Sequence, residues 1–345
     1  MGSITKTTRR HRSAAIAQRL IGLSISYERD PLLARGLGLE HLRELLVRLA
    51  RPLLRTGANL AYAGSWVERE DNFTYELLRL ISAEQEDNSI GGPDSNLAIG
   101  RLVNHLSWPV YLSVTPRVEA QWIHCCHIVR VTQQMADIAG ANVLPDDTPI
   151  EDDRRLLNTA VTLSAMRRLA TQGMLVPYKA IPTQPVIPPM SARIVLGGKL
   201  TGYSGFMPGV LEEARLAIEN RVPLYVLGGF GGASEALARA LLAHAPHTVA
   251  ELESAWHFER TPALVRLRDQ ASKTPLPPGM LDTTAGLRML SERINAARPA
   301  LADQLLTGLD EAQTREMMST TDARRAVELV LSGMSQRLGF EVLPT

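Results

Sequence analysis

Two strand, glycine and helix units follow one another directly at residues 192–233, and no other stretch of the chain constrains the fold as strongly. Short apolar runs that alternate with helical periods need crossover connections, which join neighbouring parallel strands. In such sheets small ligands bind outside the carboxyl ends of the strands, where both glycine turns fall. We predict a strand at 193–196, a loop at 197–208, a helix at about 209–219, a strand at 222–227 and a glycine turn at 228–232.

The first glycine loop has the composition of an anion-binding site. Glycines let the main chain approach a ligand, and the start of a helix offers unpaired N–H groups and the positive end of a dipole. Lys199 adds a cation, Thr201 adds a hydroxyl, and Pro208 suits the first turn of the next helix. The simpler alternative is that the glycines only make tight turns, but two adjacent glycine turns favour a phosphate-bearing, nucleotide-type ligand. The spacing matches neither the ATPase phosphate loop nor Gly-x-Gly-x-x-Gly.

The charge balance argues against nucleic acid or an anionic membrane as a partner. There are 37 basic and 36 acidic residues, a formal net charge of +1, so no overall field attracts polyanions. No run of 18 apolar residues and no leader-like segment occurs, and we expect a soluble, cytoplasmic protein.

The two cysteines, Cys125 and Cys126, are adjacent, cannot easily bridge each other, and suit a reducing compartment. Together with His124 and His127 they suggest a zinc site. On an extended strand, however, neighbouring side chains point to opposite faces and cannot converge on one ion. We therefore predict no metal site and no required cofactor.

The rest of the first 247 residues alternates strand and helix patterns, which predicts an α/β fold with a Rossmann-like, doubly wound and mainly parallel sheet. Pro52 is expected to kink or split its helix. Loops are predicted at 27–39 and 84–100. Strands are predicted at 18–26, 59–63, 109–114 and 124–131, and helices at 41–57, 71–81 and 154–173.

We divide the chain into a basic arm at 1–12, a nucleotide-binding domain at 13–247 and an α-helical extension at 248–345. The proline-rich segment 176–189 is expected to form an extended surface insertion, either a lid or a contact surface. In the extension, apolar residues recur at helical spacing, and Thr320-Thr321-Asp322 has the form of a helix cap.

The stretch LGGKLTGYSGFMPGVLEEA at 196–214 resembles a stretched version of the Pro-Gly-Gly-x-Gly-Thr-x-x-Glu turn of the LOG phosphoribohydrolases. The wider group is the SLOG superfamily, the SMF/DprA and LOG-like Rossmann domains. Together with PLYVLGGFGGA at 223–233, this sequence resembles in particular the SLOG families of prokaryotic conflict systems.

Two further stretches bear on this resemblance. Met166, Arg167 and Arg168 are similar to the Met-x-x-Arg-Lys helix of the LOG pattern, whose arginine meets the substrate. After the second strand these families are expected to have Gly-Gly-Asp, whereas this chain has Ala63-Gly64-Ser65 followed by Trp66. A serine supplies a hydroxyl but no charge, so any role of that aspartate is in doubt here.

The resemblance implies a sensor that recognises a cyclic or NAD-derived nucleotide signal in bacterial anti-phage defence, as a homo-oligomer with an effector protein as a further partner. The ligand would meet the ends of the strands and both glycine turns. The predicted binding residues are Ser24, Ser26, Gly64, Ser65, Gly197, Gly198, Lys199, Thr201, Gly202, Gly205, Met207, Pro208, Gly209, Gly228, Gly229, Phe230, Gly231 and Gly232.

Two alternatives remain open. The LOG resemblance also implies an N-glycosidic hydrolase or (deoxy)ribosyltransferase acting on a nucleotide. Glu212 or Glu213 would be the catalytic carboxylate, and Arg167 or Arg168 would orient the phosphate. The glutamate and the arginine beside it could equally form a solvent-exposed helical charge pair without a catalytic role. The other alternative is a scaffold that has lost its ligand and mediates assembly.

Overall fold

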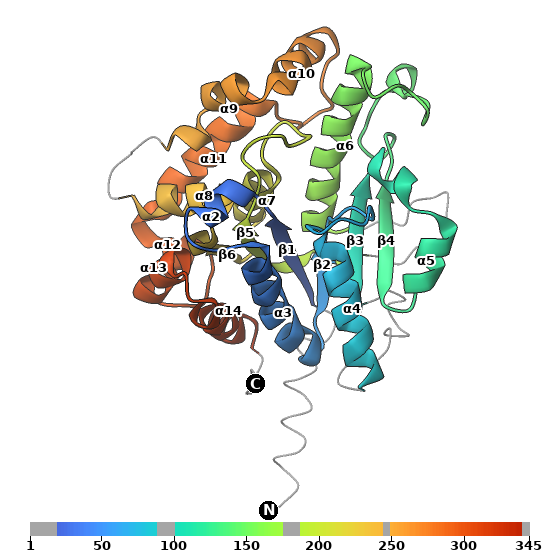
Figure 1. Ribbon diagram of the computed structural model, residues 1–345. Coiled ribbons are helices and arrows are strands. Elements are labelled where there is room, and N and C mark those ends of the chain that lie inside the picture. The colour runs from blue at the N-terminus through green and yellow to red at the C-terminus, as the bar shows by residue number, and fades with distance from the viewer. Residues whose placement is uncertain (1–18, 88–100, 175–186, 244–248, 340–345) are drawn as a thin grey trace, which may run out of the picture.

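The computed structural model describes residues 19–87, 101–174, 187–243 and 249–339, which form a six-stranded sheet between two layers of helices (Figure 1). All strand pairs are parallel, in the order β4-β3-β2-β1-β5-β6. The predicted Rossmann-like, doubly wound α/β class is therefore confirmed. The strands are β1 (Leu20–Ser26), β2 (Asn59–Tyr62), β3 (Leu102–Ser107), β4 (Cys126–Val131), β5 (Met190–Gly197) and β6 (Leu224–Leu227).

Helices cover both faces of the sheet, because parallel strands are buried on both sides. One face carries α3 (Leu39–Arg55), α4 (Phe73–Glu86) and α14 (Ala323–Leu338). The other carries α6 (Asp153–Gln172), α7 (Gly209–Glu219), α8 (Gly232–Leu242) and α11 (Thr283–Ala297). The remaining helices are α2 (Arg29–Leu33), α5 (Pro116–Trp122), α9 (Ser254–Arg260), α10 (Pro262–Lys273), α12 (Leu301–Gln304) and α13 (Glu311–Ser319).

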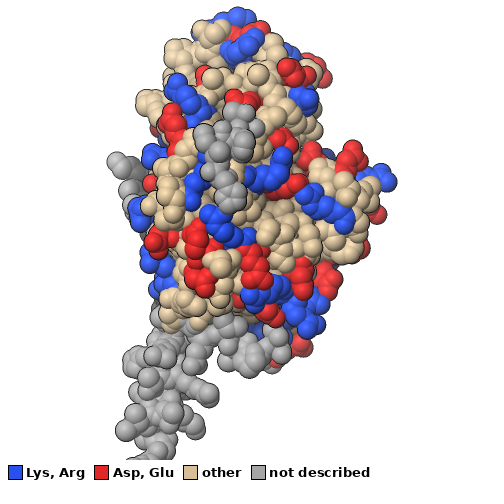
Figure 2. All heavy atoms as spheres, turned by 90° about the vertical axis from the view of Figure 1, so that its left-hand side faces the viewer, with Lys and Arg blue, Asp and Glu red and all other residues tan. Residues whose placement is uncertain are grey.

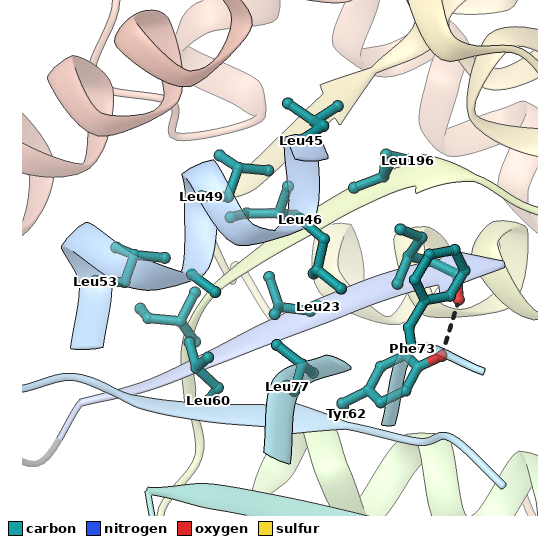
Figure 3. Packing of buried hydrophobic residues seen from close by; sticks show 14 of the residues in the cluster. Leu23, Leu45, Leu46, Leu49, Leu53, Leu60, Tyr62, Phe73, Leu77 and Leu196 are labelled. Carbon is teal, nitrogen blue, oxygen red and sulfur yellow. Dashed lines mark hydrogen bonds between the residues drawn. The ribbon is translucent and has the colours of Figure 1, made fainter. Parts of the chain in front are cut away.

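The leucines that recur at helical spacing along α3 pack into the core of the sheet. One side of this helix is lined with leucines, each worth roughly 1.5–3 kcal/mol when fully buried. Figure 3 shows Leu45, Leu46, Leu49 and Leu53 of α3 over Leu23 of β1, Leu60 of β2 and Leu196 of β5. Pro52 lies inside the helix without splitting it. The opposite side of α3 carries charged residues and is exposed.

Side-chain caps begin the predicted helices where the sequence places them. Asn72 accepts a hydrogen bond from the Thr74 N–H at the start of α4, and Asp152 does the same for Arg154 at α6. Asp322 accepts from the N–H groups of Arg324 and Arg325 at α14, so the predicted helix cap is confirmed.

One predicted strand is wrong. Residues 109–114 form a turn and a short 3-10 helix, Val110–Ser113, and the strand β3 lies earlier, at Leu102–Ser107. This strand is fully buried but contains Asn104, His105 and Ser107, which hide its apolar pattern. The predicted loop 27–39 also contains a short helix, α2, and α4 continues to Glu86 into the predicted loop 84–100.

The C-terminal helices pack against the edge strand β6. The Leu224 N–H donates to the Leu305 carbonyl at 2.9 Å, and the Tyr225 hydroxyl donates to the Thr307 carbonyl at 2.9 Å. The basic arm at 1–12 and most of the proline-rich segment 176–189 lie outside the described residues. Met174, just before that segment, is joined to Ile187 within it, since the Met174 N–H donates to the Ile187 carbonyl at 2.9 Å. Among the described residues no helix is long and apolar enough to span a membrane.

Candidate functional site

The order of the strands reverses between β1 and β5. From β1 the chain leads to α3 on one face, and from β5 it leads to α7 on the other. The two strands pair up to their last residues, Ser26 opposite Gly197. Their connections diverge beyond that pair, and in open parallel sheets ligands bind at this position. Gly197 and Gly198 of the first glycine loop therefore begin at the switch point of the sheet.

A tight turn at the end of β5 explains the first two glycines of the loop. Gly197 and Gly198 have φ values of 62° and 99°, which residues with a side chain rarely adopt. A Cβ on Gly198 would also lie 2.7 Å from Val210. The Gly198 N–H donates to the Ser26 carbonyl at 2.9 Å, and its carbonyl accepts from the Ala233 N–H at 2.9 Å. The turn thus connects β1 to the starts of both α7 and α8.

The next residues of the loop are attached to the end of β1. The Lys199 N–H donates to the Ser26 hydroxyl at 3.1 Å, and its side chain is exposed. The Leu200 N–H and the Thr201 hydroxyl donate to the two carboxylate oxygens of Glu28, at 3.2 and 3.4 Å. Burial raises the pKa of the Glu28 carboxyl, and these hydrogen bonds act in the opposite direction. Glu28 was not among the predicted site residues, although it is an acidic residue directly after a predicted strand.

Arg167 of α6 and Glu212 of α7 form an ion pair at the start of α7, although they are far apart in the sequence. Their side chains are 11% and 4% exposed. A Cβ on Gly205 or Gly209 would lie 3.2 or 2.8 Å from the Arg167 guanidinium nitrogens, so both glycines provide room for this side chain. The structure thus brings together four predicted site residues. Arg168, by contrast, pairs with Asp137 at 3.6 Å.

Glu213 turns away from Glu212 and pairs with Arg193, a fully buried residue of β5, at 3.2 Å. Arg193 also donates to the hydroxyls of Ser24 at 2.7 Å and Thr171 at 3.1 Å. Burial lowers the pKa of the Arg193 guanidinium, and the Glu213 carboxylate opposes this effect. The predicted residues Ser24 and Glu213 therefore lie in a buried polar cluster around Arg193. An arginine within an apolar strand was the signal for it.

The remainder of the first loop divides into exposed and buried residues. Gly202 and Ser204 are exposed like Lys199, and Pro208 is the buried residue directly before α7. Met207 is buried against α11, where a Cβ on Gly286 would lie 2.8 Å from the Met207 sulfur. The exposed positions therefore define the part of the loop that a ligand can reach.

The end of β2 is closed by its own side chains. A Cβ on Gly64 would overlap Tyr62 and the Thr74 hydroxyl, so this glycine permits close packing at the start of α4. Trp66 is buried and its indole N–H donates to Asn104 at 2.8 Å. Ser65 is exposed. Where related families are expected to have an aspartate, this chain therefore has an exposed serine followed by a buried tryptophan.

The second glycine turn is filled by the protein itself. A Cβ on Gly228 would overlap Ala238 and lie 2.5 Å from the Met318 carbonyl oxygen, and one on Gly229 would overlap the Thr320 carbonyl. A Cβ on Gly232 would overlap the Gly198 carbonyl. Phe230 and Gly231 are buried as well. The segment around residues 318–321 packs so closely on Gly228 and Gly229 that neither position has room for a side chain. The sequence did not indicate this structural role.

The first loop also contacts the C-terminal helices. The ring of Tyr203 packs edge-on against His257 of α9, with 5.7 Å between ring centroids. His257 is fully buried, and burial lowers the pKa of its imidazole. The loop is therefore attached to the segment between β1 and α2 through Glu28 on one side and to α9 through Tyr203 on the other.

A family model described as SLOG cluster2 matches residues 15–177 and 183–284, from β1 into the start of α11. The chain belongs to the SLOG cluster2 family. A search of curated proteins found no match. Membership of this SLOG family points to a nucleotide-related function. The match includes both glycine turns and also α9 and α10, which contact the first loop or α6.

Proposed function

We propose that this SLOG protein binds a nucleotide-derived ligand in the crevice between the ends of β1 and β5. The observation that carries the proposal is the position of the first loop, which begins at the switch point of the sheet and leads directly into α7. The exposed Lys199 would pair with a phosphate, and main-chain N–H groups at the start of α7 favour the same charge.

We further propose that binding serves to sense a signal, such as a cyclic or NAD-derived nucleotide. The attachment of the loop to both Glu28 and α9 supports this role. A phosphate that binds residues 199–201 would compete with the Glu28 carboxylate for their hydrogen bonds. It would thereby shift the contact between Tyr203 and His257. Ligand binding would then change the position of α9. The resemblance to conflict-system families supports a place in anti-phage defence.

One observation favours a second function, cleavage of the N-glycosidic bond of a nucleotide. The Arg167 and Glu212 pair lies at the start of α7, beside the proposed phosphate position. In such a reaction water attacks the anomeric carbon, the bond to the base breaks, and a carboxylate stabilises the oxocarbenium-like transition state. Glu212 would be that carboxylate, and Arg167 would keep it charged and oriented.

The first experiment compares thermal melting of the purified protein with mono-, di- and cyclic nucleotides and NAD. We expect at least one to raise the melting temperature by a few degrees at saturation. Lys199→Ala should weaken its binding about 10-fold, because a charge-assisted hydrogen bond is lost. Lys273→Ala removes an exposed lysine from α10 and is the matched control. Equal binding by both variants, or no stabilisation by any nucleotide, would contradict the binding proposal.

The second experiment separates sensing from catalysis. The same mixtures are analysed for release of free base or nicotinamide, with wild type and Glu212→Gln. Release by the wild type that the variant abolishes while it still binds would establish hydrolysis. Binding without release, together with altered hydrogen exchange in residues 254–260, would establish the sensor.

A further inference from the structure

A groove of about 1730 Å³ runs between α3 and α14, on the face of the sheet opposite to α7 and the first glycine loop. Its apolar part consists of Val47, Pro52, Val327 and Leu331. Its walls are charged, with basic and acidic side chains in similar number. They include Glu40, Arg43, Glu44, Arg48, Arg51, Arg55, Glu76, Arg324 and Glu328.

The α3 wall of this groove is a single exposed stripe. Residues spaced by three or four positions lie on one side of a helix. Glu40 and Glu44 are 78% and 57% exposed, and Arg48, Arg51 and Arg55 are 44–48% exposed. Glu40 and Glu44 lie in the first half of the helix, and Arg48, Arg51 and Arg55 lie in the second. Arg43, which also lines the groove but is only 25% exposed, interrupts this order. The helix dipole favours this order, but it does not require any symmetry of spacing.

The stripe has such a symmetry. Glu40 and Arg55 lie equally far along the chain from the midpoint between Val47 and Arg48, and so do Glu44 and Arg51. When two copies of a helix pack antiparallel about a two-fold axis at that midpoint, these positions face each other. Every acidic residue of the stripe then meets a basic residue of the other copy.

We propose that this face is a self-complementary docking surface and that its partner is a second copy of the same chain, with α3 antiparallel to α3. Val47 and Arg48 would lie on either side of the axis, and Glu40 and Glu44 would pair with Arg55 and Arg51 of the second copy.

The ion pairs within one chain leave these charges available. Glu40 pairs with Arg43 and Glu44 with Arg48, both at 2.6 Å on an exposed helix, where such pairs contribute little. Arg51 and Arg55 share one carboxylate, that of Glu84, at 2.7 and 2.6 Å. A single carboxylate cannot neutralise two guanidinium groups. Exclusion of water at a dimer interface would strengthen the new pairs.

The dimensions and the charge mixture also fit a protein partner. The 17 residues of α3 extend roughly 25 Å, and together with the α14 wall they could supply the ~800 Å² per partner of a standard interface. A nucleic acid would need one sign of charge. Figure 2 shows basic and acidic side chains intermingled on the side of the molecule that carries the C-terminal helices.

Sedimentation of the full chain over a range of concentrations tests the proposal. The wild type should dimerise reversibly, and Glu40→Lys with Glu44→Lys should raise the dimer Kd at least ~10-fold. Both positions are exposed, so the fold should persist, which an unchanged melting curve would verify. Glu253→Lys with Glu259→Lys makes the same charge change on exposed positions of the α9 region and serves as the control.

A mixing experiment tests the pairing itself. A second variant carries Arg51→Glu, Arg55→Glu and Glu84→Gln, the last to avoid like charges around the buried Glu84. Neither variant should self-associate as the wild type does, but an equal mixture should form heterodimers, because all four facing pairs are again opposite in charge. A monomeric wild type, a Kd no more affected than in the control, or a mixture that stays monomeric would each overturn the proposal.

Discussion

The two glycine turns of this protein look alike in sequence and differ in what the glycines make room for. At the first, between β5 and α7, Lys199, Gly202 and Ser204 are exposed and the loop lies at the switch point of the sheet. At the second, between β6 and α8, every residue from 228 to 232 is buried, and the backbone of residues 318–321 occupies the space. The same glycine-rich pattern therefore serves a candidate ligand site in one case and close packing in the other.

The difference follows from the positions of the two strands. β5 lies at the point where the strand order reverses, so its turn faces the diverging connection of β1. β6 is an edge strand of the sheet, and α13 and the segment that follows it cover its unpaired edge. A glycine turn at a sheet edge can thus be taken up by whichever element covers that edge.

The largest expected effect comes from Gly229→Ala. Its Cβ would overlap the Thr320 carbonyl, a backbone atom that cannot rotate away, and we expect the free energy of unfolding to fall by about 4 kcal/mol. Gly202→Ala in the first loop is the comparison. It meets no atom within 4 Å and should cost about 1 kcal/mol for its φ of 63°. Urea unfolding of both variants measures the difference, and equal losses would refute the distinction between the turns.

A smaller effect distinguishes the two adjacent glutamates of α7. Glu213→Gln leaves the fully buried Arg193 without its carboxylate, so stability should fall by about 3 kcal/mol. Glu212→Gln should cost roughly half as much, because the Arg167 side chain is 11% exposed and retains some hydration. The same unfolding assay applies. If Glu212→Gln is the more damaging change, the buried structural pair has been assigned to the wrong residue.

The smallest effect concerns the attachment of the first loop to β1. Burial raises the pKa of the Glu28 carboxyl in the folded protein above its value in the unfolded chain. The protonated carboxyl therefore contributes to the free energy of unfolding below the unfolded-state pKa of Glu28, and this contribution is lost as the pH rises through its folded-state pKa. Glu28→Gln should therefore gain stability relative to the wild type between pH 4 and pH 7. The gain should be less than about 1 kcal/mol, since the group is partly exposed and screened. Unfolding curves of both proteins at the two pH values test this, and a constant difference would contradict it.

Much of the fold could be predicted from local pattern. The loop 197–208 and the helix Gly209–Glu219 lie where the apolar spacing and the glycines place them, and the caps at Asn72 and Asp152 agree with their side-chain chemistry. The strand β3 was missed because it contains polar residues whose hydrogen-bond partners lie far away in the sequence. Asn104 donates to the carbonyls of Tyr62 and Gly64, contacts that no local pattern records.

The candidate site was predicted in part for the same reason. Arg167 and Glu212 meet as the resemblance suggested. Glu28 and Arg193 could not be assigned from the sequence, because Glu28 bonds to Leu200, more than 150 residues away, and Arg193 pairs with Glu213, more than 15 residues away. Burial decides whether a charged residue is part of a solvent-facing site or of the structure below it. That property depends on which elements cover it.

The sequence by itself determined most of the alternation of strands and helices and the two glycine turns, because backbone freedom, side-chain capping and apolar spacing act over a few residues. The tertiary structure alone decided which turn keeps exposed residues, which glutamate pairs with Arg167 and which glycines pack against the C-terminal segment. Those outcomes depend on strand order and on packing between distant segments, which short-range preferences leave undefined.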